Sequence, residues 1–247
     1  MGIFLLSACS EEVPSFRYTV EPVAYLRLPS PHFVSIPDSV MADGHQYFRD
    51  EETKALIPIQ KTKDNWVFIP DTIPANQSRT YSLVFKQDPP SELVKSDISD
   101  GKLNISLGDK PVLSYQMETM LPPDDSPEYY QRGGFIHPAH SPNGAVLTDG
   151  FPVGHTHQHG IFFAWVKTSY KDQEIDFWNQ HKENGTVVFD SLISHTGGPV
   201  FSEFEGAQTA VVLEGLDSTR VLSERWKVIV YNISEYFVWD VEVSQKN

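Results

Sequence analysis

Short segments in which apolar and polar residues alternate recur along the chain, separated by clusters of Pro, Gly, Asn and Asp. Alternation places every second side chain on one face, which is typical of half-buried β-strands, whereas no apolar helical spacing continues beyond two turns. We therefore predict an all-β protein, with a turn of helix only at residues 176–183. The expected strand regions are residues 17–28, 66–69, 80–86, 102–107, 111–117, 155–167, 187–193, 201–213, 221–232 and 236–243.

The chain divides near a polar, proline-containing stretch, residues 87–100. We expect a small N-terminal β-sandwich at residues 14–95 and a larger antiparallel β-sandwich at residues 96–247. In the larger one, the alternating Leu103, Ile105 and Leu107 precede Gly108, which predicts a hairpin. The last strand region ends four residues before the chain does, which would leave a sheet edge exposed. We therefore expect this sandwich to lack a C-terminal part.

Composition narrows the class of ligand. The 247 residues are 40% hydrophobic, which is enough to bury a core. The net charge of -14 argues against nucleic acid and disfavours anionic membranes and acidic polysaccharides, because these partners need a basic face. No apolar run approaches the roughly 18 to 20 residues of a spanning helix. A carbohydrate or another neutral small molecule suits the charge best.

The single cysteine lies next to an apolar start. Cys9 follows Leu6-Ser7-Ala8, and this order is similar to a bacterial lipobox. We expect residues 1–13 to be a signal remnant and tether with Cys9 as the lipidated residue, although no basic segment precedes the apolar run. The protein would then be a cell-envelope lipoprotein in the outer membrane, facing the periplasm or the cell surface. Its only membrane contact would be the lipid anchor.

Histidines concentrate in one segment. Five of the nine are His137, His140, His155, His157 and His159. They adjoin two long loops, residues 121–131 and 137–154, and loops of this length inside a compact β domain are usually functional or disordered. On the predicted strand at residues 155–167, side chains two apart share a face at about 6.5 to 7 Å. The first two rings of that strand could therefore meet one ligand.

Three interpretations of this segment stay open. In the first, the rings line a polar cleft and perform acid–base chemistry or bind a ligand. In the second, His155 and His157 hold a divalent metal ion with a third ligand from His137, His140, His195 or Asp176, because His159 would lie about 13 Å from His155 on a straight strand. In the third, the histidines are structural or simply solvated.

Two further groups of residues are candidates. Asp176-Phe177-Trp178 suits a sugar platform, since a pyranose stacks on an indole while its hydroxyls bond the acid. The alternative is a tryptophan in the core. Glu203 and Glu205 share a strand face, as paired catalytic carboxylates do, but a solvated face is the commoner reason for such spacing.

Four motifs occur together in the second half of the chain. They are Gly134-Phe135-Ile136-His137-Pro138, Asp149-Gly150-Phe151-Pro152, the run from His155 to Trp165, and Asp176-Phe177-Trp178. With these motifs the chain resembles, over roughly residues 95–245, a bacterial domain of unknown function that is labelled methane oxygenase PmoA. The first 90 residues resemble its usual β-rich N-terminal region.

The resemblance implies a carbohydrate-linked role, because the family occurs in exported proteins of polysaccharide-degrading bacteria. Its members commonly carry His at positions 155 and 157 and often Arg at position 159, which favours the first two as the working pair. Its domain usually continues past residue 247. We do not expect the methane oxidation that the label implies, because the methane monooxygenase subunit of that name spans the membrane several times.

We therefore expect an exported lipoprotein that binds a carbohydrate in a His-rich cleft. Whether it also processes this carbohydrate stays open. The alternatives are a non-catalytic glycan-binding or interaction lipoprotein, and a metal-dependent oxidoreductase as the family label suggests. The only cofactor considered is one divalent metal ion at His155 and His157. The expected catalytic residues are His155, His157, His137 and Asp176, and the expected substrate ligands are Trp178, His159, Arg132 and His140.

Overall fold

The computed structural model describes residues 16–41, 43–91 and 93–247, and the chain forms two compact units that divide after Pro90. Strands make up 50% of the chain, so the all-β prediction is confirmed. Within the described residues, helical geometry is limited to two 3-10 turns, η1 (Asp38–Val40) and η2 (Glu128–Tyr130). In the described part of the chain, no helix has the length and apolar character needed to cross a membrane. The predictions for residues 1–13, Cys9 included, lie outside the described residues.

The first unit contains two antiparallel sheets, in the orders β1-β7-β3-β4 and β2-β6-β5. Their facing side chains form one core, in which Phe48 and Phe68 from different sheets meet edge to face with ring centroids 4.8 Å apart. The strands are β1 (Arg17–Val20), β2 (His32–Val34), β3 (His45–Asp50), β4 (Leu56–Pro58), β5 (Gln60–Lys61), β6 (Trp66–Phe68) and β7 (Arg79–Lys86).

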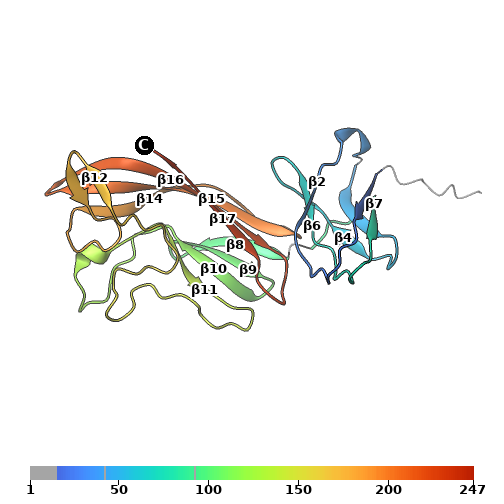
Figure 1. Cartoon of the computed structure of the whole chain (residues 1–247), viewed down its shortest axis with the longest axis horizontal. Helices are drawn as coiled ribbons and strands as arrows, with labels where there is room; N and C mark the ends of the chain where they lie inside the picture. The colour runs from blue at the N-terminus through green and yellow to red at the C-terminus, as the bar shows by residue number, and fades with distance from the viewer. Residues whose placement is uncertain (1–15, 42, 92) are drawn as a thin grey trace, which may run out of the picture. The chain divides into compact units, whose positions relative to one another are not determined.

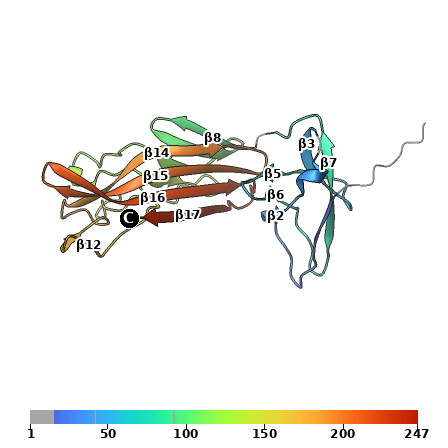
Figure 2. The same cartoon turned by 90° about the horizontal axis from the view of Figure 1, so that it is seen from above.

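The second unit is built on two four-stranded antiparallel sheets and one small hairpin. Figure 1 shows the sheets as a red-orange layer and a green layer, and Figure 2 shows the order β14-β15-β16-β17 from above. The other sheet has the order β11-β10-β9-β8, and β12 pairs with β13. The strands are β8 (Val94–Ser99), β9 (Lys102–Leu107), β10 (Lys110–Gln116), β11 (Phe135–Ala139), β12 (Thr168–Tyr170), β13 (Gln173–Ile175), β14 (Gly185–Thr196), β15 (Phe201–Glu214), β16 (Asp217–Tyr231) and β17 (Trp239–Lys246).

The core of the second unit joins these two large sheets face to face. Tyr115 on β10 packs on Phe204 of β15 at 4.9 Å and on Trp226 of β16 at 6.4 Å between ring centroids. The predicted β9–β10 hairpin is present, with Leu103 and Ile105 buried against the same cluster. Such packing of two twisted sheets is a β-sandwich. Val94 already pairs with Leu107, so strand structure of this unit begins just before the predicted boundary at residue 95.

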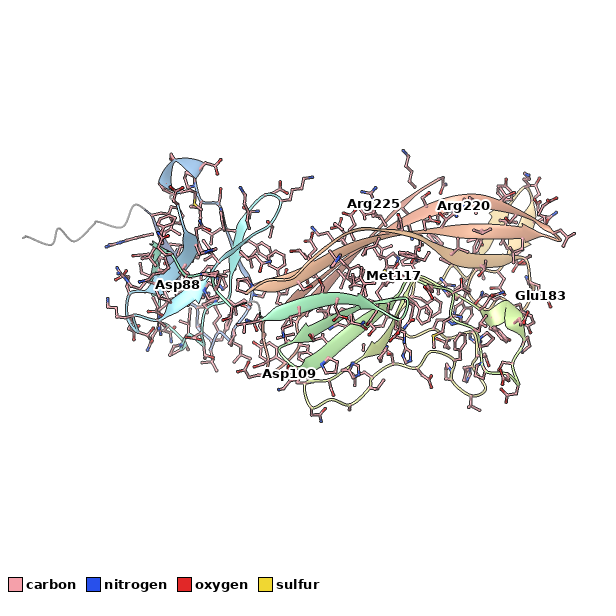
Figure 3. The ribbon with its side chains drawn as sticks, turned by 180° about the vertical axis from the view of Figure 1, so that it is seen from behind. Asp88, Asp109, Met117, Glu183, Arg220 and Arg225 are labelled. Carbon is pink, nitrogen blue, oxygen red and sulfur yellow. The ribbon has the colours of Figure 1, made fainter. Side chains whose placement is uncertain are left out.

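The outward face of β15 and β16 carries cross-strand ion pairs. Glu205 lies 2.9 Å from Arg225, and Glu203 lies 3.0 Å from Lys227. Arg225 is labelled on this sheet in Figure 3. Both glutamates therefore belong to a solvated, charge-paired face, which was the alternative to a catalytic pair.

Candidate functional site

The histidine segment is a loop, so the strand predicted at residues 155–167 is wrong. His155 and Gln158 close a turn through a 2.8 Å backbone hydrogen bond, and Gly154 and Gly160 have φ of +80° and +70°. A left-handed glycine on each side interrupts a strand. Only Ile161 keeps a β-bridge, to Ile136 on β11. The positions of these rings are therefore set by the turn and not by alternation along a strand.

The turn nevertheless brings two of the predicted rings together. The centroids of His155 and His157 are 5.9 Å apart, and His157 meets Trp178 edge to face at 5.2 Å. Partial burial, followed by the nearby His155, lowers the pKa of His157, while Asp176 opposes this shift. His181 also acts on His157 electrostatically. We call His155, His157, Trp178 and His181 the ring cluster.

Polar ring atoms of this cluster remain available to a ligand. Gln158 Nε2 lies 3.2 Å from Nε2 of His157 and donates to it, so the neutral ring carries its proton on Nδ1. Within the described part of the chain, His157 Nδ1, Trp178 Nε1 and both ring nitrogens of His155 have no hydrogen-bond partner. The cluster can therefore donate and accept hydrogen bonds beside an aromatic surface.

Asp176 fixes the loop that presents Trp178. Its Oδ1 accepts the backbone N–H groups of Trp178 at 3.2 Å and Asn179 at 2.8 Å, and its Oδ2 lies 3.4 Å from His181 Nδ1. A carboxylate that accepts two backbone donors in this way forms an Asx turn. Asp176, a predicted catalytic acid, is buried, and these contacts position Trp178 and His181 of the ring cluster.

His159, a predicted substrate ligand, is an internal residue. Its ring has no exposed surface and is surrounded by Phe135, Phe151 and Phe162 at 5.0 to 5.6 Å. Nε2 lies 3.0 Å from Gln180 Oε1. Burial, then Arg132, lowers the pKa of His159 to about 3, so the ring stays neutral at physiological pH.

Arg132, the second predicted ligand of this kind, is also fully buried. It donates to the backbone oxygens of Phe177 at 3.0 Å and Phe163 at 3.3 Å, and its guanidinium lies 4.8 Å from the Phe162 ring centroid. Burial lowers its pKa to about 10, and Glu224 opposes this, so the side chain remains charged at neutral pH. Arg132 holds the two site loops from inside and is not placed to touch a ligand.

Glu224 supplies the opposite charge in a buried polar network. Its Oε1 accepts from Trp165 at 3.0 Å and Gln245 at 2.9 Å, and its Oε2 accepts from Gln208 at 2.7 Å and Trp226 at 3.4 Å. Glu224 was not among the site residues predicted from the sequence. It was detectable, because Glu224 shares the inward face of β16 with the buried Trp226, Val228 and Val230.

His137 and His140 form a separate group on β11 and the loop after it. His137 Nδ1 lies 3.0 Å from Thr148 Oγ1, and its pKa is lowered by burial, with Asp149 opposing. The backbone N–H of His140 donates to Val112 on β10. The structure thus places His137 beside Thr148 and Asp149 and pairs His140 with Val146, whereas the ring cluster takes its contacts from the 155–158 turn and the 176–181 loop.

No metal centre is assembled among the described residues. They contain no group of three or more His, Cys, Asp or Glu side chains that could hold an ion. His155 and His157 alone would supply two ligands, whereas protein zinc sites use three or four. Of the proposed third ligands, Asp176 is engaged by its own loop and His195 Nδ1 lies 2.9 Å from Ser96 Oγ.

Comparison with known proteins assigns the second unit to a family. The model described as "Family of unknown function (DUF6807)" matches residues 102–247, more than half of the chain. The chain belongs to the DUF6807 family. No curated protein and no solved structure matches it. The DUF6807 region contains the ring cluster, the buried Arg132 and Glu224, and both large sheets of the second unit from β9 onward.

Proposed function

We propose that the DUF6807 region binds a neutral carbohydrate at the ring cluster. The observation that carries the proposal is the meeting of His157 with both Trp178 and His155, at 5.2 and 5.9 Å between ring centroids, where several ring nitrogens have no partner among the described residues. Sugars present an apolar face and a rim of hydroxyls, and an indole beside imidazole nitrogens complements both.

Electrostatics supports a neutral ligand. The lowered pKa of His157 keeps that imidazole uncharged at pH 7, so it offers its Nδ1–H as a donor and presents no cation to a carboxylate or sulfate. Acidic residues outnumber basic ones by 33 to 19, so an anionic polysaccharide would also meet an unfavourable long-range field.

Processing of the carbohydrate is a second step that the same residues could support. General base catalysis by His157 would require the substrate to displace Gln158 from Nε2, which is the ring nitrogen that can accept a proton. The oxidoreductase alternative and the methane oxygenase label have weaker support, because the matching family has no assigned function and no three-residue metal group is found among the described residues.

We further propose, from the sequence alone, that the protein is a lipoprotein of the cell envelope anchored through Cys9. The support is the order Leu6-Ser7-Ala8-Cys9 after an apolar start. Expression of the complete gene product with a radiolabelled fatty acid tests this. Label should be incorporated into the natural chain and be absent from Cys9→Ser; equal labelling of both would refute the anchor.

Binding is tested with the full chain on an array of neutral and anionic glycans. Trp178→Ala and His157→Ala should each reduce retention on neutral glycans by about tenfold or more, as expected when one aromatic contact and its hydrogen bonds are lost. Tyr25→Ala removes an exposed aromatic residue of the first unit and is the matched control. Equal retention by all variants would refute the proposed site, and turnover of a bound glycan would establish an enzyme.

A further inference from the structure

We infer that Tyr129 and Tyr130 form a second carbohydrate subsite beside the ring cluster, so that the ligand is a neutral oligosaccharide and not a single sugar. This inference rests on the proposed function and specifies its ligand. The two tyrosine rings, both partly exposed, have centroids 4.5 Å apart on the η2 turn. Tyrosine is enriched at binding surfaces, because its ring is apolar and its hydroxyl can bond a polar ligand.

The loop that carries the tyrosines is anchored at its base. Met120 and Arg132 exchange two backbone hydrogen bonds, of 2.9 and 3.2 Å, and so close the intervening segment. Within it, Gln131 N–H bonds Glu128 O at 2.9 Å and completes η2. The tyrosines are therefore presented on a loop with fixed ends, which reduces the ordering cost of binding.

Gln180 joins this loop to the ring cluster. Its Nε2 donates to the backbone oxygens of Tyr129 at 3.2 Å and Gln131 at 3.3 Å, and also lies 3.1 Å from Thr186 Oγ1. Gln180 follows Trp178 by two residues, so their Cα atoms are at most about 7 Å apart. The tyrosine pair and Trp178 thus lie on adjacent loops, and Figure 3 labels the neighbouring Glu183 at this end of the unit.

The chemistry of the second loop matches that of the first. A side-chain hydrogen bond with Tyr129, together with partial burial, raises the pKa of Tyr130, so the phenol of Tyr130 is neutral. The same loop exposes Asp124, Asp125 and Glu128. These carboxylates accept hydrogen bonds from hydroxyl groups and repel uronic acids, so the loop selects neutral sugars.

The test is isothermal titration of the full chain with β-glucan, xylan and mannan oligosaccharides of one to six sugars, and with a galacturonic acid series. For the neutral series that binds, affinity should rise at least tenfold between one and four sugars. Tyr130→Leu and Tyr129→Leu should each remove about two- to tenfold of that gain and leave the affinity for the monosaccharide unchanged. Trp178→Ala should weaken every length.

The possible outcomes separate the two proposals. If binding depends on Trp178 but not on length, or if the Tyr→Leu variants keep the whole length gain, the second subsite is refuted and the proposed function survives. If no series binds, or if Trp178→Ala binds normally, both are refuted. Tyr130→Phe, which keeps the ring, should retain most of the gain, and a normal thermal transition shows that each variant is folded.

Discussion

Replacing Glu224 with glutamine should destabilise the DUF6807 region by about 3 to 5 kcal/mol. Glu224 is 2% exposed and accepts four hydrogen bonds, two on each carboxylate oxygen. Whichever way the new amide turns, two of the four donors face its NH2 group, and each unsatisfied buried donor costs about 1 to 3 kcal/mol. Arg132 also loses its opposing charge.

The assay is urea unfolding followed by tryptophan fluorescence, because Trp165 and Trp226 both contact Glu224. Glu235→Gln, an exposed glutamate just beyond β16, is the matched control and should change stability by less than about 0.5 kcal/mol. Adding Arg132→Met to Glu224→Gln should cost less than the sum of the single variants, by more than about 1 kcal/mol. A loss below about 1 kcal/mol for Glu224→Gln would refute this reasoning.

Three further predictions concern the site loops. Stability should fall as the pH drops below about 6.5, because the unfolded chain binds a proton at His159 there, whereas the folded protein binds it only near the lowered pKa of about 3. The loss is about 1.4 kcal/mol per pH unit for this one group, and His159→Phe should remove that contribution in acid titrations. Gly160→Ala should cost about 2 to 5 kcal/mol of stability in urea unfolding, because the added Cβ would lie 2.3 Å from a backbone oxygen. The control Gly144→Ala, whose Cβ would meet nothing within 4 Å, should cost about 1 kcal/mol, and equal losses would contradict the contact. Gln180→Met should cost about 2 to 4 kcal/mol and lower the melting temperature by roughly 5 to 15 °C, and an unchanged melting temperature would mean that Gln180 does not join the loops.

The strands that were predicted well are those whose alternation reflects a core on one side. Leu103 and Ile105 face the core, and Ser106 between two buried positions faces outward, so the sequence period reports the sheet directly. The same pattern located β15 and β16, although β15 ends one residue later and β16 begins four residues earlier than predicted. In these segments local pattern and tertiary packing agree.

The histidine segment was predicted wrongly, because its histidines recur at every second position without forming a strand. His155, His157 and His159 have the spacing of a strand, but Gly160 adopts a positive φ and the buried Arg132 fixes the following aromatic residues through Phe163 O and the Phe162 ring. These contacts join residues about 30 positions apart in the sequence, so a pattern within a short stretch of sequence cannot reveal them. Gln180 was missed for the same reason, since its partners His159 and Tyr129 are distant in sequence.

The most direct test of the ring cluster is the indole N–H spectrum of the full chain during titration with a neutral oligosaccharide. The protein has five tryptophans, and Trp178→Phe assigns the resonance of Trp178. We predict that this resonance shifts progressively on addition of the neutral sugar while the other four stay in place, and that a galacturonic acid oligomer has no effect. A saturable shift confined to other indoles, with Trp178 unmoved, would contradict the account.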